Sequence, residues 1–188
     1  MTDDPNAPAA PPEPTVVQNA ELALLLEVTG TPKPGNVDRA HEYDDLRFEH
    51  FVAGAVGARP GLELAANGER VGRAFERAVA GMSQQSAGNT QFGALLALVP
   101  LVQAATTGEL SGARAGKIAA ATTVDDAADF YRAFEHVNVA VDDPPEGLEP
   151  LDVRRGAGAV PALRERQLTL YDVMDRSAEV DGIAREWT

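Results

Sequence analysis

The chain has 188 residues, of which 44% are hydrophobic and only 5% aromatic, and it carries 29 acidic against 16 basic side chains. A formal net charge of −13 argues against non-specific nucleic-acid binding, and the lack of cysteine excludes disulfides and cysteine-based zinc sites. No signal segment is evident, and the longest strongly apolar stretch, residues 92–105, is shorter than the roughly 20 residues of a membrane span. We therefore expect a soluble cytoplasmic protein that does not enter a membrane.

The basic residues include only two lysines, Lys33 and Lys117. An ordinary acidic cytosolic protein would not need so few lysines for solubility. A carboxylate-rich surface stays solvated at molar salt, where repulsion between like charges is screened within a few ångströms. The composition therefore favours a halophilic protein from a high-salt cytoplasm over an ordinary acidic cytosolic protein.

The first half of the chain alternates helical patterns with loops. Residues 1–14 are rich in Pro, Ala and Asp, and we expect them to be disordered. Apolar spacing predicts a helix over residues 15–28, after which Pro and Gly make residues 29–38 a loop. Helical character returns near Leu46, pauses at residues 59–61 around a proline, and resumes over residues 69–83.

The second half opens with residues 86–90, a loop in which Asn89 or Thr90 can cap the next helix. That helix is apolar nearly all round, so it should lie at the centre of a bundle. A shorter helix is expected over residues 111–121, and capping-box patterns at Thr123 and Thr169 each open a further one. We predict an all-α multi-helix bundle of six or seven helices, formed as a single domain over residues 15–188.

The last predicted helix carries Val173, Val180, Ile183 and Trp187 and stops at Thr188 without a capping residue. A large apolar residue so near the end of a chain is expected to have a partner. We therefore expect either self-association as a homo-oligomer or the absence of a C-terminal portion.

The first candidate site is the segment EVTGTPKPGNVDR, residues 27–39. Lys33 stands between two prolines that stiffen its backbone, and Gly35 allows a ligand to approach the main chain closely. A fixed lysine beside a glycine is suited to phosphate binding. The alternative is a rigid inter-helix loop with a solvated lysine.

Carboxylates accumulate around this segment, at Glu27, Asp38, Asp44 and Asp45. One or two of them, together with water and phosphate oxygens, could hold Mg²⁺. His50 lies close by in the sequence and could add a polar group. The alternative is that these acids only belong to a generally acidic surface.

The second candidate site is the segment GNTQFG, residues 88–93. Asn89 and Thr90 precede an apolar helix, where side-chain amide and hydroxyl groups adjoin free backbone N–H groups. This arrangement can bind an anion or a ribose. Plain helix capping, with glycine allowing close packing, explains the same residues.

The two segments together resemble the triphosphoribosyl-dephospho-CoA synthase family. Residues 26–39 are similar to its Pro-Lys-Pro-Gly-x-Val-Asp signature, and residues 87–101 to its Gly-x-Asn-Thr-His-x-Gly motif and the apolar helix after it. The order and separation of the motifs also agree, and the likeness extends over about residues 22–105. The resemblance implies an all-α fold and a transferase in cofactor biosynthesis that joins the triphosphoribosyl group of ATP to dephospho-CoA and releases adenine.

The resemblance also implies roles for individual residues. Lys33, with Gly35 and Arg39 beside it, would hold the triphosphate, and Asp38 and Asp45 would bind Mg²⁺. A carboxylate near the reacting carbon would come from Glu27, Asp38, Asp44 or Asp45, because ribosyl transfer passes through an oxocarbenium-like state. The nucleotide pocket would be lined by Gly88, Asn89, Thr90, Gln91 and His50.

The chain departs from the family pattern in three respects. Gln91 stands where the family has histidine, Asn36 replaces an apolar residue, and family members are longer, so C-terminal helices that close the site are expected to be missing. These departures keep two alternatives open besides a transferase with dephospho-CoA or a related acceptor. One is a non-catalytic helical module that binds a nucleotide or phosphorylated ligand, and the other is a salt-adapted bundle without a site.

Overall fold

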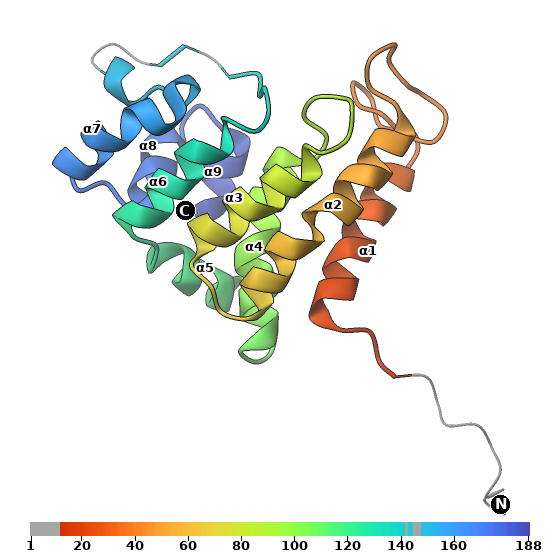
Figure 1. Cartoon of the computed structure of the whole chain (residues 1–188). Coiled ribbons are helices and arrows are strands. Elements are labelled where there is room, and N and C mark those ends of the chain that lie inside the picture. The colour runs from red at the N-terminus through yellow and green to blue at the C-terminus, as the bar shows by residue number, and fades with distance from the viewer. Residues whose placement is uncertain (1–11, 142, 145–147) are drawn as a thin grey trace, which may run out of the picture.

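The computed structural model describes residues 12–141, 143–144 and 148–188, and within these ranges it contains nine α-helices, two 3₁₀ helices and no strand (Figure 1). The all-α prediction is confirmed. The helices outnumber the six or seven expected because the C-terminal third is divided into several short ones. The predicted disordered tail falls mainly on residues 1–11, which lie outside the described ranges.

The N-terminal helices are α1 (Val16–Thr29), α2 (Phe48–Ala66) and α3 (Val71–Met82). The capping box of Thr15 and Gln18 opens α1 where the sequence predicts. The predicted pause at residues 59–61 is wrong, because α2 continues through Pro60. A proline removes one backbone hydrogen bond, and packing of α2 on α3 holds the helix together across that gap.

Helices α2 and α3 cross with their backbones in contact. A Cβ atom placed on Gly57 would lie 2.3 Å from the carbonyl oxygen of Gly81, and one placed on Gly61 would lie 2.3 Å from the backbone nitrogen of Ala78. No side chain larger than hydrogen fits at these positions without moving a helix. The alanine- and glycine-rich composition therefore serves an unusually close helix–helix contact.

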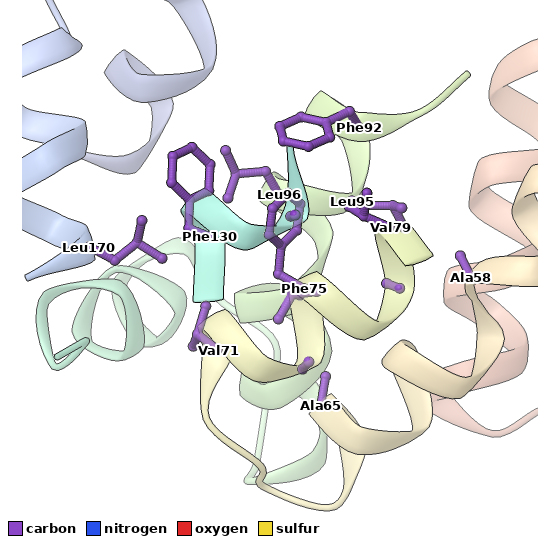
Figure 2. Packing of buried hydrophobic residues seen from close by; sticks show 14 of the residues in the cluster. Ala58, Ala65, Val71, Phe75, Val79, Phe92, Leu95, Leu96, Phe130 and Leu170 are labelled. Carbon is purple, nitrogen blue, oxygen red and sulfur yellow. The ribbon is translucent and has the colours of Figure 1, made fainter. Parts of the chain in front are cut away.

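Helix α4 (Phe92–Thr106) is the buried central helix that its apolar sequence predicts. None of its residues from 92 to 105 is exposed, and it contacts α1, α2, α3, α5 and α9. Figure 2 shows Phe75, Phe92 and Phe130, from three different helices, meeting in the core. The ring centroid of Phe75 lies 5.0 Å from that of Phe92 and 5.7 Å from that of Phe130, so aromatic packing joins α3, α4 and α6.

Helices α5 (Gly112–Ala120) and α6 (Val124–Ala133) follow, and α6 packs on α3 through buried acids. Asp126, only 3% exposed, accepts hydrogen bonds from the Gly72 N–H at 2.8 Å and from the backbone and hydroxyl of Thr123 at 2.8 and 2.6 Å. The neighbouring Asp129 pairs with Arg70 at 2.7 Å. This polar contact fastens the C-terminal half of the molecule to α3.

The C-terminal segment comprises 3₁₀ helices at Glu149–Leu151 and Val153–Ala159 and then α7 (Val160–Glu165), α8 (Leu170–Ser177) and α9 (Gly182–Trp187). The capping box predicted at Thr169 is present. The single last helix of the prediction is two helices, because the chain leaves the helix after Ser177 and Asp181 caps a new one. Trp187 is only 6% exposed, whereas Val180 is 78% exposed.

The packing of α9 bears on two expectations. Ile183 lies against Gly93 of α4, and Trp187 is buried in the main core, so most of the apolar face of the last helix is covered from within the molecule. Self-association through that face remains a prediction without support from this packing. Within the described part of the chain, no helix is both long and apolar enough to cross a membrane.

Candidate functional site

The loop between α1 and α2 is built on a small hydrophobic cluster of its own. Val28, Val37 and Phe51 are buried together, with Leu46 and Phe48 packed partly against them. Gly35 has a φ of +78°, in the left-handed region that favours glycine, and it turns the chain so that the Asn36 N–H donates to the Lys33 carbonyl at 3.0 Å. The loop therefore has a fixed shape, as its prolines predict.

Asp38 is the centre of this loop and is fully buried. Its Oδ2 accepts from the Lys33 N–H at 2.9 Å, and its Oδ1 accepts from the N–H groups of Ala40 at 2.7 Å and His41 at 3.0 Å. Burial alone would raise the pKa of this carboxyl, but the hydrogen bonds, led by that from Ala40, hold its pKa well below the usual range. Both oxygens are used to shape the loop, so the geometry gives Asp38 a positioning role.

Lys33 is held by a single carboxylate. Its Nζ lies 2.5 Å from Oε1 of Glu27, at the end of α1, and 5.9 Å from the centroid of the Phe51 ring. The lysine side chain is 18% exposed and that of Glu27 is 46% exposed. The Nζ atom is itself buried and makes no hydrogen bond of good geometry. A phosphate group bound here would therefore compete with Glu27 for the ammonium.

The loop between α3 and α4 carries the second motif. Asn89 Oδ1 accepts from the N–H of Phe92, the first residue of α4, at 3.0 Å, and the Gly88 carbonyl accepts from the Gln85 side chain at 2.8 Å. The side-chain nitrogen of Gln91 donates to the Leu24 carbonyl of α1 at 3.2 Å. The N-cap of α4 is therefore Gln91 and not the predicted Asn89 or Thr90, and the Gln91 side chain ties this loop to α1.

Thr90 and Gln91 also leave two buried oxygen atoms unused. Thr90 Oγ1 and Gln91 Oε1 are buried and have no hydrogen-bond partner among the residues that the structure describes. Both lie over Gly54 of α2, since a Cβ atom on that glycine would be 2.5 Å from the threonine hydroxyl and 3.5 Å from the glutamine oxygen. Buried polar atoms without partners are rare in folded proteins, and a ligand can satisfy them.

The start of α2 brings the two loops together. His50 Nδ1 accepts from the Arg47 N–H at 3.1 Å, which places the ring proton on Nε2, 3.4 Å from the Ser86 hydroxyl of the α3–α4 loop. One turn further along α2, Gly54 faces Thr90. In Figure 1 both loops lie at the same end of the bundle. The structure therefore brings Glu27, Lys33, His50 and Thr90–Gln91 to one region.

The remaining predicted site residues lie on the edge of this region. Arg39, Asp44 and Asp45 are exposed on the loop before α2, and no ion pair or hydrogen bond is seen between their side chains and the described residues. Within those residues no three His, Asp or Glu side chains come together as a metal site. Because Asp38 is fully used by its loop and Asp45 has no partner among the described residues, that part of the chain presents no preformed Mg²⁺ site.

Several residues of the region were not predicted from the sequence. Phe51 beneath Lys33, the Leu24 carbonyl and Gly54 all belong to helices outside the two motifs. One signal was available, since His50, Gly54 and Gly57 are spaced by four and three residues and share a face of α2. The partner of that face depends on how α2 crosses α3 and α4, which the spacing does not give.

Comparison with known proteins agrees with these motifs. The model of the ATP:dephospho-CoA triphosphoribosyl transferase family matches residues 13–188. A solved structure from Archaeoglobus fulgidus, described as a candidate triphosphoribosyl-dephospho-CoA synthase, is similar with a TM-score of 0.57 and 28% sequence identity. The likeness covers 76% of this chain and 57% of that one, so the chain spans little more than half of the solved protein. No curated protein matches the sequence.

Proposed function

The chain belongs to the ATP:dephospho-CoA triphosphoribosyl transferase family, and on this basis we propose that it transfers the triphosphoribosyl group of ATP to a ribose hydroxyl of dephospho-CoA or a related acceptor, with release of adenine. The observation that carries the proposal is the meeting of the two motif loops at one end of the bundle. Lys33 from one loop and the unpaired oxygens of Thr90 and Gln91 from the other lie around the start of α2.

The proposed reaction is a displacement at C1′ of the ATP ribose. The acceptor hydroxyl oxygen forms a bond to C1′, the bond from C1′ to the adenine nitrogen breaks, and the hydroxyl proton ends on adenine. The transition state carries positive charge on the sugar, which a nearby carboxylate stabilises. Of the carboxylates predicted for this role, Glu27 is the one that is partly exposed and also contacts Lys33.

Lys33 and Glu27 would act together in this scheme. A triphosphate that binds the Lys33 ammonium draws it away from Glu27, and the released carboxylate is then free to face the sugar. Thr90 and Gln91 would accept hydrogen bonds from ribose hydroxyls with the oxygens that lack partners. Asp38 would hold Lys33 in place through the loop rather than touch substrate.

The metal and the setting of the reaction are part of the proposal. Since the described residues hold no preformed site, Mg²⁺ would enter bound to the phosphates of ATP, and we assign no residue as its ligand. The chain has 29 acidic and 16 basic residues, and only two of the basic ones are lysines; this composition supports action in a high-salt cytoplasm.

The test is adenine release. The protein is incubated with ATP, Mg²⁺ and dephospho-CoA at molar KCl, and adenine is followed by chromatography. We expect adenine release by the wild type and a roughly hundredfold lower rate for Lys33→Ala, since that variant lacks the ammonium that would bind the transferred phosphates. Lys117→Ala is the matched control, because Lys117 is the other lysine and lies exposed on α5.

Either of two results would count against the proposal. ATP binding without any adenine would favour the non-catalytic nucleotide-binding module. If Lys33→Ala and Lys117→Ala release adenine at equal rates, the proposed activity stands, but Lys33 does not bind the triphosphate.

A further inference from the structure

A second feature adjoins the candidate site on α2. It is a surface hollow of about 370 Å³ between α2, the end of α3 and the start of the α3–α4 loop, lined by Ala53, Gly57, Arg77, Gly81, Gln84 and Gln85. Ala53 is the neighbour of Gly54, which contacts Thr90 of the candidate site. The hollow and the site therefore lie side by side on one helix.

The base of the hollow is backbone. Gly57 and Gly81 form one of the points at which α2 and α3 touch, and because both are glycines no side chain projects from either into the space. The carbonyl groups at the end of α3 are occupied, since Gly81 accepts from the Gln84 N–H at 3.2 Å and Val79 from the Ser83 N–H at 3.0 Å. An anion in the hollow would thus meet few free acceptor oxygens, although it lies at a helix C-terminus.

Arg77 supplies the charge. Its exposed guanidinium has no ion pair or hydrogen bond with any described residue, whereas Arg70 and Arg73 of the same helix pair with Asp129 and Glu76 at 2.7 Å. A guanidinium presents a planar set of N–H donors that matches two oxygens of a phosphate group.

The glutamines differ in how firmly they are held. Gln85 is fixed in the loop, since its nitrogen donates to the Gly88 carbonyl at 2.8 Å and its oxygen accepts from the Ala87 N–H at 2.7 Å. Gln84 makes only a long side-chain contact, 3.4 Å to the Ala80 carbonyl. Gln85 therefore forms a wall, and the Gln84 amide is free to turn and donate to a ligand.

We propose that this hollow binds a phosphate group of an adenine nucleotide substrate, with Arg77 as its main donor. The inference rests on the proposed function, in which both substrates carry a chain of phosphates. Lys33 alone is a poor anchor for such a chain, because Glu27 already pairs with it. Arg77 of α3 adds a further cation, without an ion pair among the described residues, in the hollow that α2 also lines. The phosphates come either from ATP or from the acceptor, and the test separates these two sources.

The experiment measures binding by calorimetry, at moderate and at molar KCl, for ATP, dephospho-CoA and inorganic tripolyphosphate. Arg77→Gln removes the charge, and Arg166→Gln is the matched control because Arg166 is also exposed and its side chain has no partner among the described residues. We expect roughly tenfold to hundredfold weaker binding for Arg77→Gln, as for loss of a hydrogen bond to a charged group, and no change for Arg166→Gln. Thermal unfolding of both variants checks that they fold.

The pattern of losses identifies the source of the phosphates. Weaker binding of ATP and tripolyphosphate assigns the hollow to the triphosphate, and weaker binding of dephospho-CoA alone assigns it to the diphosphate of the acceptor. Equal affinities for wild type and Arg77→Gln, or no binding of any probe by the wild type, would overturn the subsite.

Adenine release by the wild type is scored separately. If the wild type releases adenine and Arg77→Gln binds the probes as the wild type does, the proposed function is supported and the phosphate subsite is refuted. Lost binding in Arg77→Gln without release by the wild type would support the subsite and remove the proposed function.

Discussion

Two buried aspartates stabilise two different regions of this molecule. Among the described residues, Asp38 accepts hydrogen bonds from its own loop, from residues at most seven positions away. Asp126 accepts one from Gly72, which is 54 residues away, and so joins α6 to α3. The comparison teaches that a buried carboxylate with local partners shapes a loop, whereas one with a distant partner holds the fold. Removing each should therefore have effects of different kinds.

The largest effect is expected for Asp126→Ala. The change leaves the buried N–H of Gly72 and the partly buried N–H of Thr123 without their partner, and it removes a charge beside Arg70. We expect the free energy of unfolding to fall by about 3 kcal/mol, measured by urea denaturation. Asp125→Ala is the control, because Asp125 is 65% exposed and its ion pair within the described chain is with the exposed Arg164. A loss no larger than that of the control would contradict the role given to Asp126.

A smaller loss of global stability, but a larger loss of function, is expected for Asp38→Asn. The amide keeps the shape of the side chain but turns one of its two acceptor oxygens into a donor, which must then face the N–H of Lys33 or the N–H groups of Ala40 and His41. Hydrogen exchange should rise over residues 33–41 and stay low in α3 and α6. Asp175→Asn, exposed on α8, serves as the control. Exchange that rises across the whole chain would show that Asp38 also holds the fold.

The same loop should open in acid. The folded pKa of Asp38 is depressed, so its contribution to stability is complete above the unfolded value of about 4 and is lost as the pH falls below that toward the folded pKa. Hydrogen exchange at pH 5 and at pH 3, corrected for the intrinsic rate, should show the loop of residues 33–41 losing protection over this range. In Asp38→Asn the change between the two pH values should disappear for this loop. A wild-type loop equally protected at both would rule out this linkage.

The smallest effect is expected for Thr123→Ala. Thr123 caps α6 and donates its hydroxyl to Asp126 at 2.6 Å, but the bond from Gly72 to Asp126 survives the change. We expect the free energy of unfolding to fall by about 1 kcal/mol, the usual cost of losing an N-cap. Thr123→Ser keeps the hydroxyl and should therefore keep most of this stability. A loss as large as that of Asp126→Ala would mean that the cap, and not the contact with α3, carries the stabilisation.

Much of the fold could be predicted from local patterns. The capping boxes at Thr123 and Thr169 mark helix starts because their hydrogen bonds lie within four residues of sequence. The all-round apolar character of residues 92–105 places α4 at the centre for a similarly local reason. The continuation of α2 through Pro60 was missed, because it depends on the contact with α3, and tertiary packing can outweigh a local helix breaker.

The candidate site was predicted in part. Its two loops carry motifs that are recognisable in the sequence, and the structure places Lys33 beside Glu27 and Thr90 beside Gln91. The burial of Asp38 and the proximity of Gly54 and Arg77 could not be predicted, since all depend on the path of the loop and on the angle at which helices cross. Binding and catalytic roles for these residues remain predictions until the variants are measured.

The close crossing of α2 and α3 also has an entropic consequence. Gly57, Gly61, Ala78 and Gly81 have no side-chain rotamers, so this contact forms without the loss of side-chain freedom that larger residues would incur. For the same reason it has no alternative side-chain packing into which it could rearrange. The two helices that carry Gly54 and Arg77 are thereby kept in one relative orientation, whatever happens in the loops above them.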